Sequence, residues 1–324
     1  MQQQIVKIMP KNADNQIKLL KENSSLAATK IVAKYLHHLR SITVIRQLIS
    51  LITATQQHRG ANLALLEGDS YFSDKVNALQ NEIDSRITTL QLLNQELSMP
   101  IPIQDIGTLL QEWETVRDWS GSTALENFNL HSNFIEQQMK LMWHVTEKTN
   151  CFLLAATPKP ANPDTSPPQQ RELLAGDTLL VQFILLETPE LMEILARIRG
   201  LATHACVIGV CDSEHSSWLD HLLKQLNLKK ERFRALSKSL QRYSLRDVPA
   251  LIDLQIQDAR IVQLIQLVEN KILHQDSIDI DSHNIFTMVT NIINSQMEVV
   301  KQGLDFIQNK IHRQLDGWHY ETAL

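Results

Sequence analysis

Apolar side chains recur every three or four residues along most of this chain, and no segment shows the strict alternation typical of a β-strand. Residues at this spacing share one face of a helix. In the segment after Ser73 they are Val76, Leu79, Ile83, Ile87 and Leu90. The segment 282–315 repeats the pattern. The sequence therefore predicts an all-α fold of antiparallel helices, each of roughly 25 residues, in bundle packing.

Glycines, prolines and capping residues predict where the helices end. Gly68 stops one helix, and Ser70 or Ser73 caps the next. Pro189 is tolerated in the first turn of a helix that continues to Gly209. The other predicted helices cover 13–38, 106–119, 124–156, 172–186, 248–273 and 282–315, with one more around Trp218.

A proline-rich segment divides the chain almost in half. Residues 157–170 hold five of the ten prolines, together with Asn, Asp and Ser, which is the composition of a linker. We therefore expect three parts, which are a first helical half over 1–156, the linker over 157–170 and a second helical half over 171–324.

Each half contains one Arg-Gly pair, and Arg59-Gly60 and Arg199-Gly200 are the only two in the chain. Both follow an apolar helical run and precede a glycine stop. A glycine inside a helix costs about 1 kcal/mol relative to alanine, so close approach of a neighbouring backbone or a small ligand is expected in return. A buried arginine needs an anionic partner. The alternative is a packing glycine beside a solvated arginine, and the matched context of the two pairs favours a duplicated site.

The stretch Gln56-Gln57-His58-Arg59-Gly60 and the residues up to Phe72 resemble the first motif of the nitrate- and nitrite-sensing (NIT) domain family. More loosely, 196–200 and 285–293 are similar to its later motifs. His58 and Ile198 stand where that family has an acidic residue. The resemblance implies two up-and-down four-helix bundles that bind nitrate or nitrite between helices and regulate an output domain. Since this chain ends without one, we expect a separate output protein.

Nitrate is a planar monoanion, and the guanidinium fork matches its plane with two parallel hydrogen bonds. The sequence thus predicts Arg59 and Arg199 as anion-binding residues, with Gly60 and Gly200 allowing close approach. Gln56, one turn before Gly60, is a candidate second donor or a surface amide. Two arginines on facing helices would repel each other until the anion draws them together, which makes a two-state element.

Composition excludes several other classes of protein. The net charge of −5 argues against a general nucleic-acid binder, and three cysteines do not make a disulfide framework. The sequence shows no signal peptide and no membrane span, which predicts a cytoplasmic location. Because no catalytic or dinucleotide motif occurs, we expect neither enzymatic activity nor a cofactor. One group of possible metal ligands fits no standard ligand spacing, so buried thiols are favoured over a metal site. The group consists of His204, Cys206, Cys211, His215 and His221.

A second hypothesis rests on a basic ridge, defined as the Lys and Arg residues between 224 and 246. Lys230, Arg234, Lys238, Arg242 and Arg246 recur every four residues. Such a ridge would suit an RNA-binding or protein-interaction adaptor, although a solvated helix face is the more common explanation. The partners expected are therefore nitrate or nitrite and an output protein, with a second copy of the chain left open.

Overall fold

A computed structural model of the chain describes residues 26–97, 101, 103–121, 123–150, 176–244, 248–273 and 275–322. These residues form helices and connecting turns and contain no strand, so the all-α prediction is confirmed for them. None of the described helices is both long and apolar enough to cross a lipid bilayer. The predicted linker over 157–170 lies outside the described residues, as do residues 1–25, which include the first part of the predicted helix 13–38.

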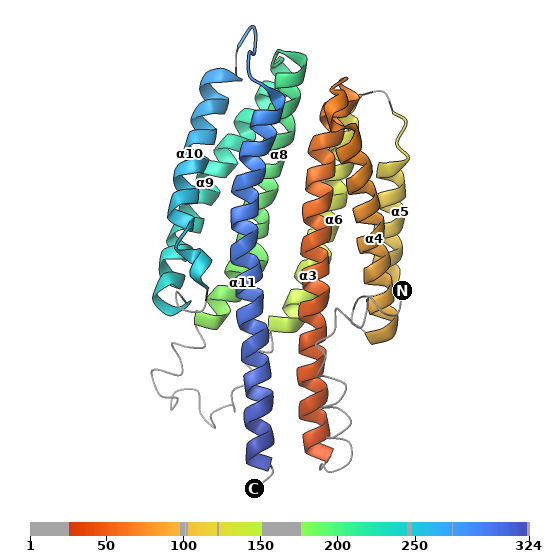
Figure 1. Ribbon diagram of the computed structural model, residues 1–324, viewed down its shortest axis with the longest axis vertical. Coiled ribbons are helices and arrows are strands. Elements are labelled where there is room, and N and C mark those ends of the chain that lie inside the picture. The colour runs from red at the N-terminus through yellow and green to blue at the C-terminus, as the bar shows by residue number, and fades with distance from the viewer. Residues whose placement is uncertain are drawn as a thin grey trace.

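The long helices fall into two groups of four, which lie side by side in Figure 1. The first group comprises α3 (Leu26–Leu66), α4 (Ser73–Leu97), α5 (Ile103–Arg117) and α6 (Ala124–Asn150). The second comprises α8 (Thr188–Ile208), α9 (Ser213–Ser244), α10 (Leu254–Lys271) and α11 (Ser282–Thr322). Short helical turns η1 (Ser70–Phe72), η3 (Phe183–Glu187) and η4 (Pro249–Leu251) join some of them.

Helix α3 lies at the centre of the molecule and packs on α4, α6 and α8. A helix with neighbours on several sides buries more than one face, and Ile45, Leu48 and Leu51 are accordingly all completely buried. In the second group α8 packs on α9 and α11 in the same way. The long helices α3 and α11 both project past the others at one end of the molecule (Figure 1).

Two breaks that the sequence predicts between helices do not occur in the structure. A helix ending at His38 was expected, but α3 continues without a break to Leu66. No glycine or proline interrupts it there, and the Ser41 hydroxyl donates to the His37 carbonyl oxygen at 3.0 Å instead of capping a new helix. The predicted separation before Pro189 is also wrong, because the π-helical turn η3 leads directly into α8. The Thr188 hydroxyl donates to the Phe183 carbonyl oxygen at 2.8 Å within that turn.

The predicted glycine stops are confirmed. Gly68 and Gly209 follow the ends of α3 and α8 with φ angles of 98° and 74°. Residues with a side chain rarely adopt this left-handed backbone conformation, so glycine ends a helix here at the lowest conformational cost. Both helices therefore carry an Arg-Gly pair and then stop within ten residues.

Candidate anion site

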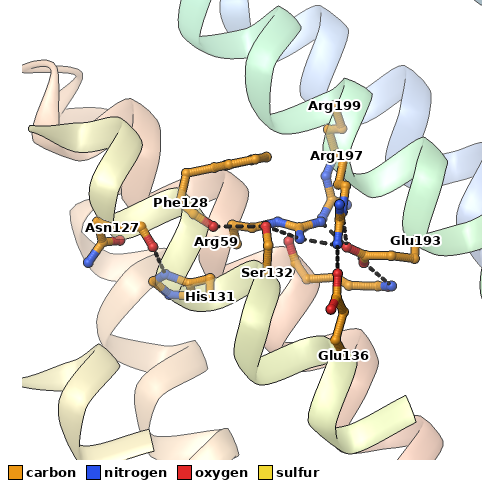
Figure 2. A network of polar contacts seen from close by, with 10 residues as sticks. Arg59, Asn127, Phe128, His131, Ser132, Glu136, Glu193, Arg197 and Arg199 are labelled. Atoms are coloured by element: carbon orange, nitrogen blue, oxygen red, sulfur yellow. Dashed lines mark hydrogen bonds and ion pairs between the residues drawn. The ribbon is translucent and has the colours of Figure 1, made fainter. Parts of the chain in front are cut away.

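Arg59 of α3 is completely buried, and its guanidinium group is held by a carboxylate from the other half of the chain. Its Nη1 lies 2.7 Å from Oε1 of Glu193 on α8, and its Nη2 lies 3.3 Å from Oε2. Nη1 also donates to the Ser132 hydroxyl of α6 at 2.9 Å, and the guanidinium lies over the Phe128 ring. Figure 2 shows this network between α3, α6 and α8. The anion that Arg59 meets in this structure is thus a protein side chain.

Glu193 is shared among several donors, which explains how a carboxylate with 8% of its side chain exposed remains charged. The Arg197 Nε donates to Oε1 at 2.7 Å, and the Gln56 amide donates to Oε2 at 2.9 Å. Burial acts to raise the pKa of Glu193, but the positive charges of Arg59 and Arg197 outweigh it, and the pKa lies below its usual value. Arg197 in turn pairs with Glu136 at 2.9 Å.

Arg199 is buried as completely as Arg59, but it is bound by neutral oxygen atoms. Its Nη1 donates to the Thr290 hydroxyl at 2.9 Å, and its Nη2 donates to the backbone carbonyl of Gln56 at 2.7 Å. Among the described residues, no carboxylate comes within ion-pair distance of it. Burial, which is the largest cause, and the charge of Arg59 together lower the pKa of Arg199 to about 9, although Glu193 acts in the opposite direction.

The two arginines occupy equivalent settings. Arg59 stacks on Phe128 at 4.9 Å and bonds to Ser132, and Arg199 stacks on Phe286 at 4.6 Å and bonds to Thr290. In α6 and in α11 the hydroxyl residue follows the phenylalanine by four positions and donates to its carbonyl oxygen. This repeated geometry supports the duplication expected from the Arg-Gly pairs. Glu193 breaks it, because position 53, which corresponds to it in α3, is a threonine.

The two glycines accommodate aromatic rings. A Cβ atom at Gly60 would lie 3.2 Å from the Phe286 ring and 3.5 Å from Arg199 Nε. At Gly200 it would lie only 2.7 Å from the Phe128 ring. We expected a backbone or an anion at these positions. The rings fill the space because each phenylalanine packs on the glycine of one half and stacks on the arginine of the other.

His58, which replaces the acidic residue of the family motif, faces away from the arginines into the first group of helices. Its Nδ1 lies 2.7 Å from Nε2 of His131, whose Nδ1 donates to the Asn127 carbonyl oxygen at 2.8 Å. Since a carbonyl oxygen only accepts, His131 Nε2 accepts and His58 Nδ1 donates. Burial lowers the pKa of His58 to about 4, so both rings are neutral near pH 7. In the second half the buried Ile198 takes the place of His58.

The charges of these groups do not cancel. We define the arginine cluster as Arg59, Arg197, Arg199, Glu136 and Glu193. Three guanidinium groups face two carboxylates, which leaves one positive charge. Two buried donors, the Nε–H groups of Arg59 and Arg199, have no hydrogen-bond partner among the described residues, and the Gln56 Oε1 acceptor has none either. Buried polar groups in proteins are normally paired, so these atoms provide unused hydrogen-bonding capacity for another partner.

Most of the basic ridge is used within the protein. Lys229 and Arg232 pair with the fully buried carboxylate of Glu187 at 2.7 and 2.6 Å. The other ion pairs of the ridge are Lys224 with Asp220, Lys229 with Glu190, Lys230 with Glu231, and Arg234 with Asp258 and Glu231. Within the described residues, Lys238 and Arg242 make no ion pair, and Arg246 lies outside them. A large part of the ridge therefore neutralises the acidic residues beside α9.

Two cavities lie away from the arginine cluster. One of about 370 Å³ opens between α9 and α10 and is lined by Lys230, Phe233, Lys238 and Gln296 among others. The second, of about 200 Å³, lies between α5 and α6. Neither is lined by Arg59 or Arg199, whose surroundings are filled by the phenylalanine rings. Volume alone therefore does not mark the chemically unusual part of this molecule, and we base the site on burial and charge.

No described group of three or more His, Cys, Asp or Glu residues is arranged to hold a metal ion. Cys211 is buried, and burial raises the pKa of the half-buried Cys206 to about 12, so its thiol stays protonated at neutral pH.

Sequence reasoning missed the residues that complete the site. Glu193 is the most important, and it lies 134 residues from Arg59 along the chain. One local signal was present, because Glu193 and Arg197 are four residues apart on α8 and form an ion pair. Phe128-Ser132 and Phe286-Thr290 share the same spacing in the two halves. Phe286 and Thr290 belong to the segment 285–293, which is similar to one of the later motifs of the NIT domain family.

Comparisons with models of known protein families, with curated proteins and with solved structures found no match for this chain. The resemblance to NIT domains therefore depends on the motifs quoted above.

Proposed function

We propose that the protein is a cytoplasmic sensor of a small monovalent oxyanion, nitrate or nitrite, which binds in the arginine cluster between the two halves of an arrangement of two four-helix bundles. The observation that carries the proposal is Arg199, a completely buried guanidinium group whose hydrogen bonds within the described part of the chain go to neutral oxygen atoms. A buried charge without a counterion costs several kcal/mol, so its retention in a core indicates a use. An anion beside Arg199 would supply the missing charge.

The unpaired Nε–H groups of Arg199 and Arg59 add two donors to such a site. A planar oxyanion accepts in its plane, as a carboxylate does, and so suits a guanidinium edge. Arg59 would contribute through Nε while Glu193 holds its Nη atoms. The backbone carbonyl oxygen of Gln56 accepts from Arg199, and its side-chain amide donates to Glu193, the partner of Arg59. Gln56 therefore couples the two arginines.

Packing provides a route from binding to signalling. Because Phe128 and Phe286 fill the space beside the guanidinium groups, an anion is admitted only if side chains and helices shift. The helices concerned include α3 and α11, which carry Arg59 and Thr290. Both project from the rest of the molecule at one end (Figure 1). A separate output protein at that end would sense their movement.

A thermal-shift panel of nitrate, nitrite, sulfate, phosphate and chloride at constant ionic strength tests the proposal. Binding to the folded state alone at 100 times Kd adds about 2.7 kcal/mol to the free energy of unfolding. We expect nitrate or nitrite to raise the Tm, and Arg59→Ala and Arg199→Met to abolish the rise. Arg46→Ala is the matched control, because Arg46 is also on α3 but pairs with the surface residue Asp305.

The second hypothesis, an adaptor that uses the basic ridge, makes a different prediction. Salt-dependent RNA binding that survives Arg199→Met and disappears in a Lys238→Ala/Arg242→Ala variant would support it. The ion pairs of Lys229, Arg232 and Arg234 make it the weaker of the two.

A further inference from the structure

Glu193 is the feature of the arginine cluster that the duplication does not explain. Arg59 and Arg199 have equivalent hydroxyl and aromatic partners, but among the described residues only Arg59 pairs with a carboxylate, and the position in α3 that corresponds to Glu193 is Thr53. Without Glu193, the buried guanidinium groups of Arg59 and Arg199 would present two uncompensated positive charges to a bound anion. With Glu193 in place, they present one.

We propose that Glu193 determines the charge of the anion that binds, so that the site accepts a monovalent anion and excludes sulfate and other dianions. This inference rests on the proposed function, since it concerns the same site. A dianion beside Arg199 would place one uncompensated negative charge next to the buried carboxylate of Glu193. In a poorly solvated interior, an unpaired charge of either sign is strongly unfavourable.

Other charges near the site do not replace this control. Arg197 and Glu136 compensate each other at 2.9 Å, and the side chain of Glu136 is 50% exposed. The ammonium group of Lys75 on α4 lies 4.3 Å from the centre of the Phe286 ring of α11, but the residue is only half-buried, so water solvates part of its charge. Glu193, with 8% of its side chain exposed, is the carboxylate that would repel a bound anion most strongly.

Glu193→Gln tests the proposal because it removes the charge and preserves the shape and an acceptor oxygen. We expect the wild-type Tm to rise with nitrate and not with sulfate at the same ionic strength. Glu193→Gln should gain a sulfate response, with affinity for sulfate increased at least roughly tenfold by the second uncompensated charge. Glu136→Gln is the matched control, since it removes the same charge from the same cluster at a solvated position, and it should keep the wild-type selectivity.

A second variant restores the charge balance. Arg59→Met/Glu193→Gln removes one positive and one negative charge, so it should bind nitrate more weakly than the wild type and reject sulfate again. If Glu193→Gln does not fold, this double variant carries the test, and a sulfate response from it would overturn the proposal. A folded Glu193→Gln variant without a sulfate response would also overturn the proposal. An equal gain of sulfate response in Glu136→Gln would do the same. Failure of the wild type to respond to either nitrate or nitrite would instead contradict the proposed function, and a sulfate response of Glu193→Gln would still be informative about Glu193.

Discussion

Arg59 and Arg199 are both completely buried, yet Arg59 shares the Glu193 carboxylate at 2.7 Å while Arg199 bonds to a hydroxyl and a backbone carbonyl. One guanidinium group therefore belongs to a buried ion pair, and the other, within the described residues, is a cation bound by neutral groups. This difference between two otherwise equivalent residues separates the groups that stabilise the fold from the group that we expect to bind a ligand.

Substitution of the two arginines should have opposite effects on stability in the absence of nitrate. Arg59→Met removes the bidentate hydrogen bonds to the buried Glu193 carboxylate, which should lower the free energy of unfolding by about 3–5 kcal/mol. Arg199→Met removes an uncompensated buried charge, so the free energy of unfolding should stay the same or rise. Urea unfolding measures both, with Arg46→Met as the surface control. Equal destabilisation by both substitutions would indicate that Arg199 is structural.

The two glycines should differ in their tolerance of alanine. Gly200→Ala places Cβ 2.7 Å from the Phe128 ring, and the resulting overpacking should lower the free energy of unfolding by about 1–3 kcal/mol. Gly60→Ala meets Phe286 at 3.2 Å, so a smaller clash is offset by the gain of about 1 kcal/mol in helix propensity. Gly107 in α5 has no such neighbour within 4 Å and is the control, for which alanine should be stabilising. A Gly200→Ala variant as stable as Gly107→Ala would contradict the packing described here.

The His58–His131 pair should make stability depend on pH. Burial lowers the pKa of His58 from 6.5 to about 4, so the unfolded chain binds more protons between these values and stability falls as the pH falls through them. The loss from His58 should be on the order of 3 kcal/mol at pH 4.

A His58→Ile/His131→Val variant tests this, because Ile198 and Val289 are the buried residues at the corresponding positions of the second half. Its stability should vary less with pH between 6.5 and 4 than that of the wild type, when both are measured by urea unfolding. Parallel curves for the two proteins would show that the histidines do not titrate in this way.

Nitrate binding should weaken at high pH. Burial and Arg59 lower the pKa of Arg199 to about 9, so above that value a growing fraction of the protein has lost the charge that attracts the anion. The nitrate-dependent rise in Tm should be larger at pH 7 than at pH 10. Lys75 also has a lowered pKa, through burial and Arg199, so Lys75→Met is the control and should retain the difference. A rise of equal size at both pH values would exclude Arg199 titration.

Much of the fold follows from the sequence, because helical spacing and glycine stops are local properties. The continuous passage of α3 through His38 was not predicted, since the sequence there has no strong signal for either outcome. The buried positions of Arg59 and Arg199 follow from their apolar surroundings. Glu193 could not be placed beside Arg59 in this way, because only the packing of α8 against α3 brings them together. The role of Gly60 and Gly200 was predicted as close approach, but the identity of the approaching ring depends on α6 and α11.

Calorimetric titration of nitrate into the wild type and into Arg199→Met tests the central claim most directly. The account predicts one nitrate per chain for the wild type, and no measurable binding for Arg199→Met although that variant is folded and at least as stable. Nitrate binding of equal affinity by Arg199→Met, or no binding by the wild type at millimolar nitrate, would contradict it.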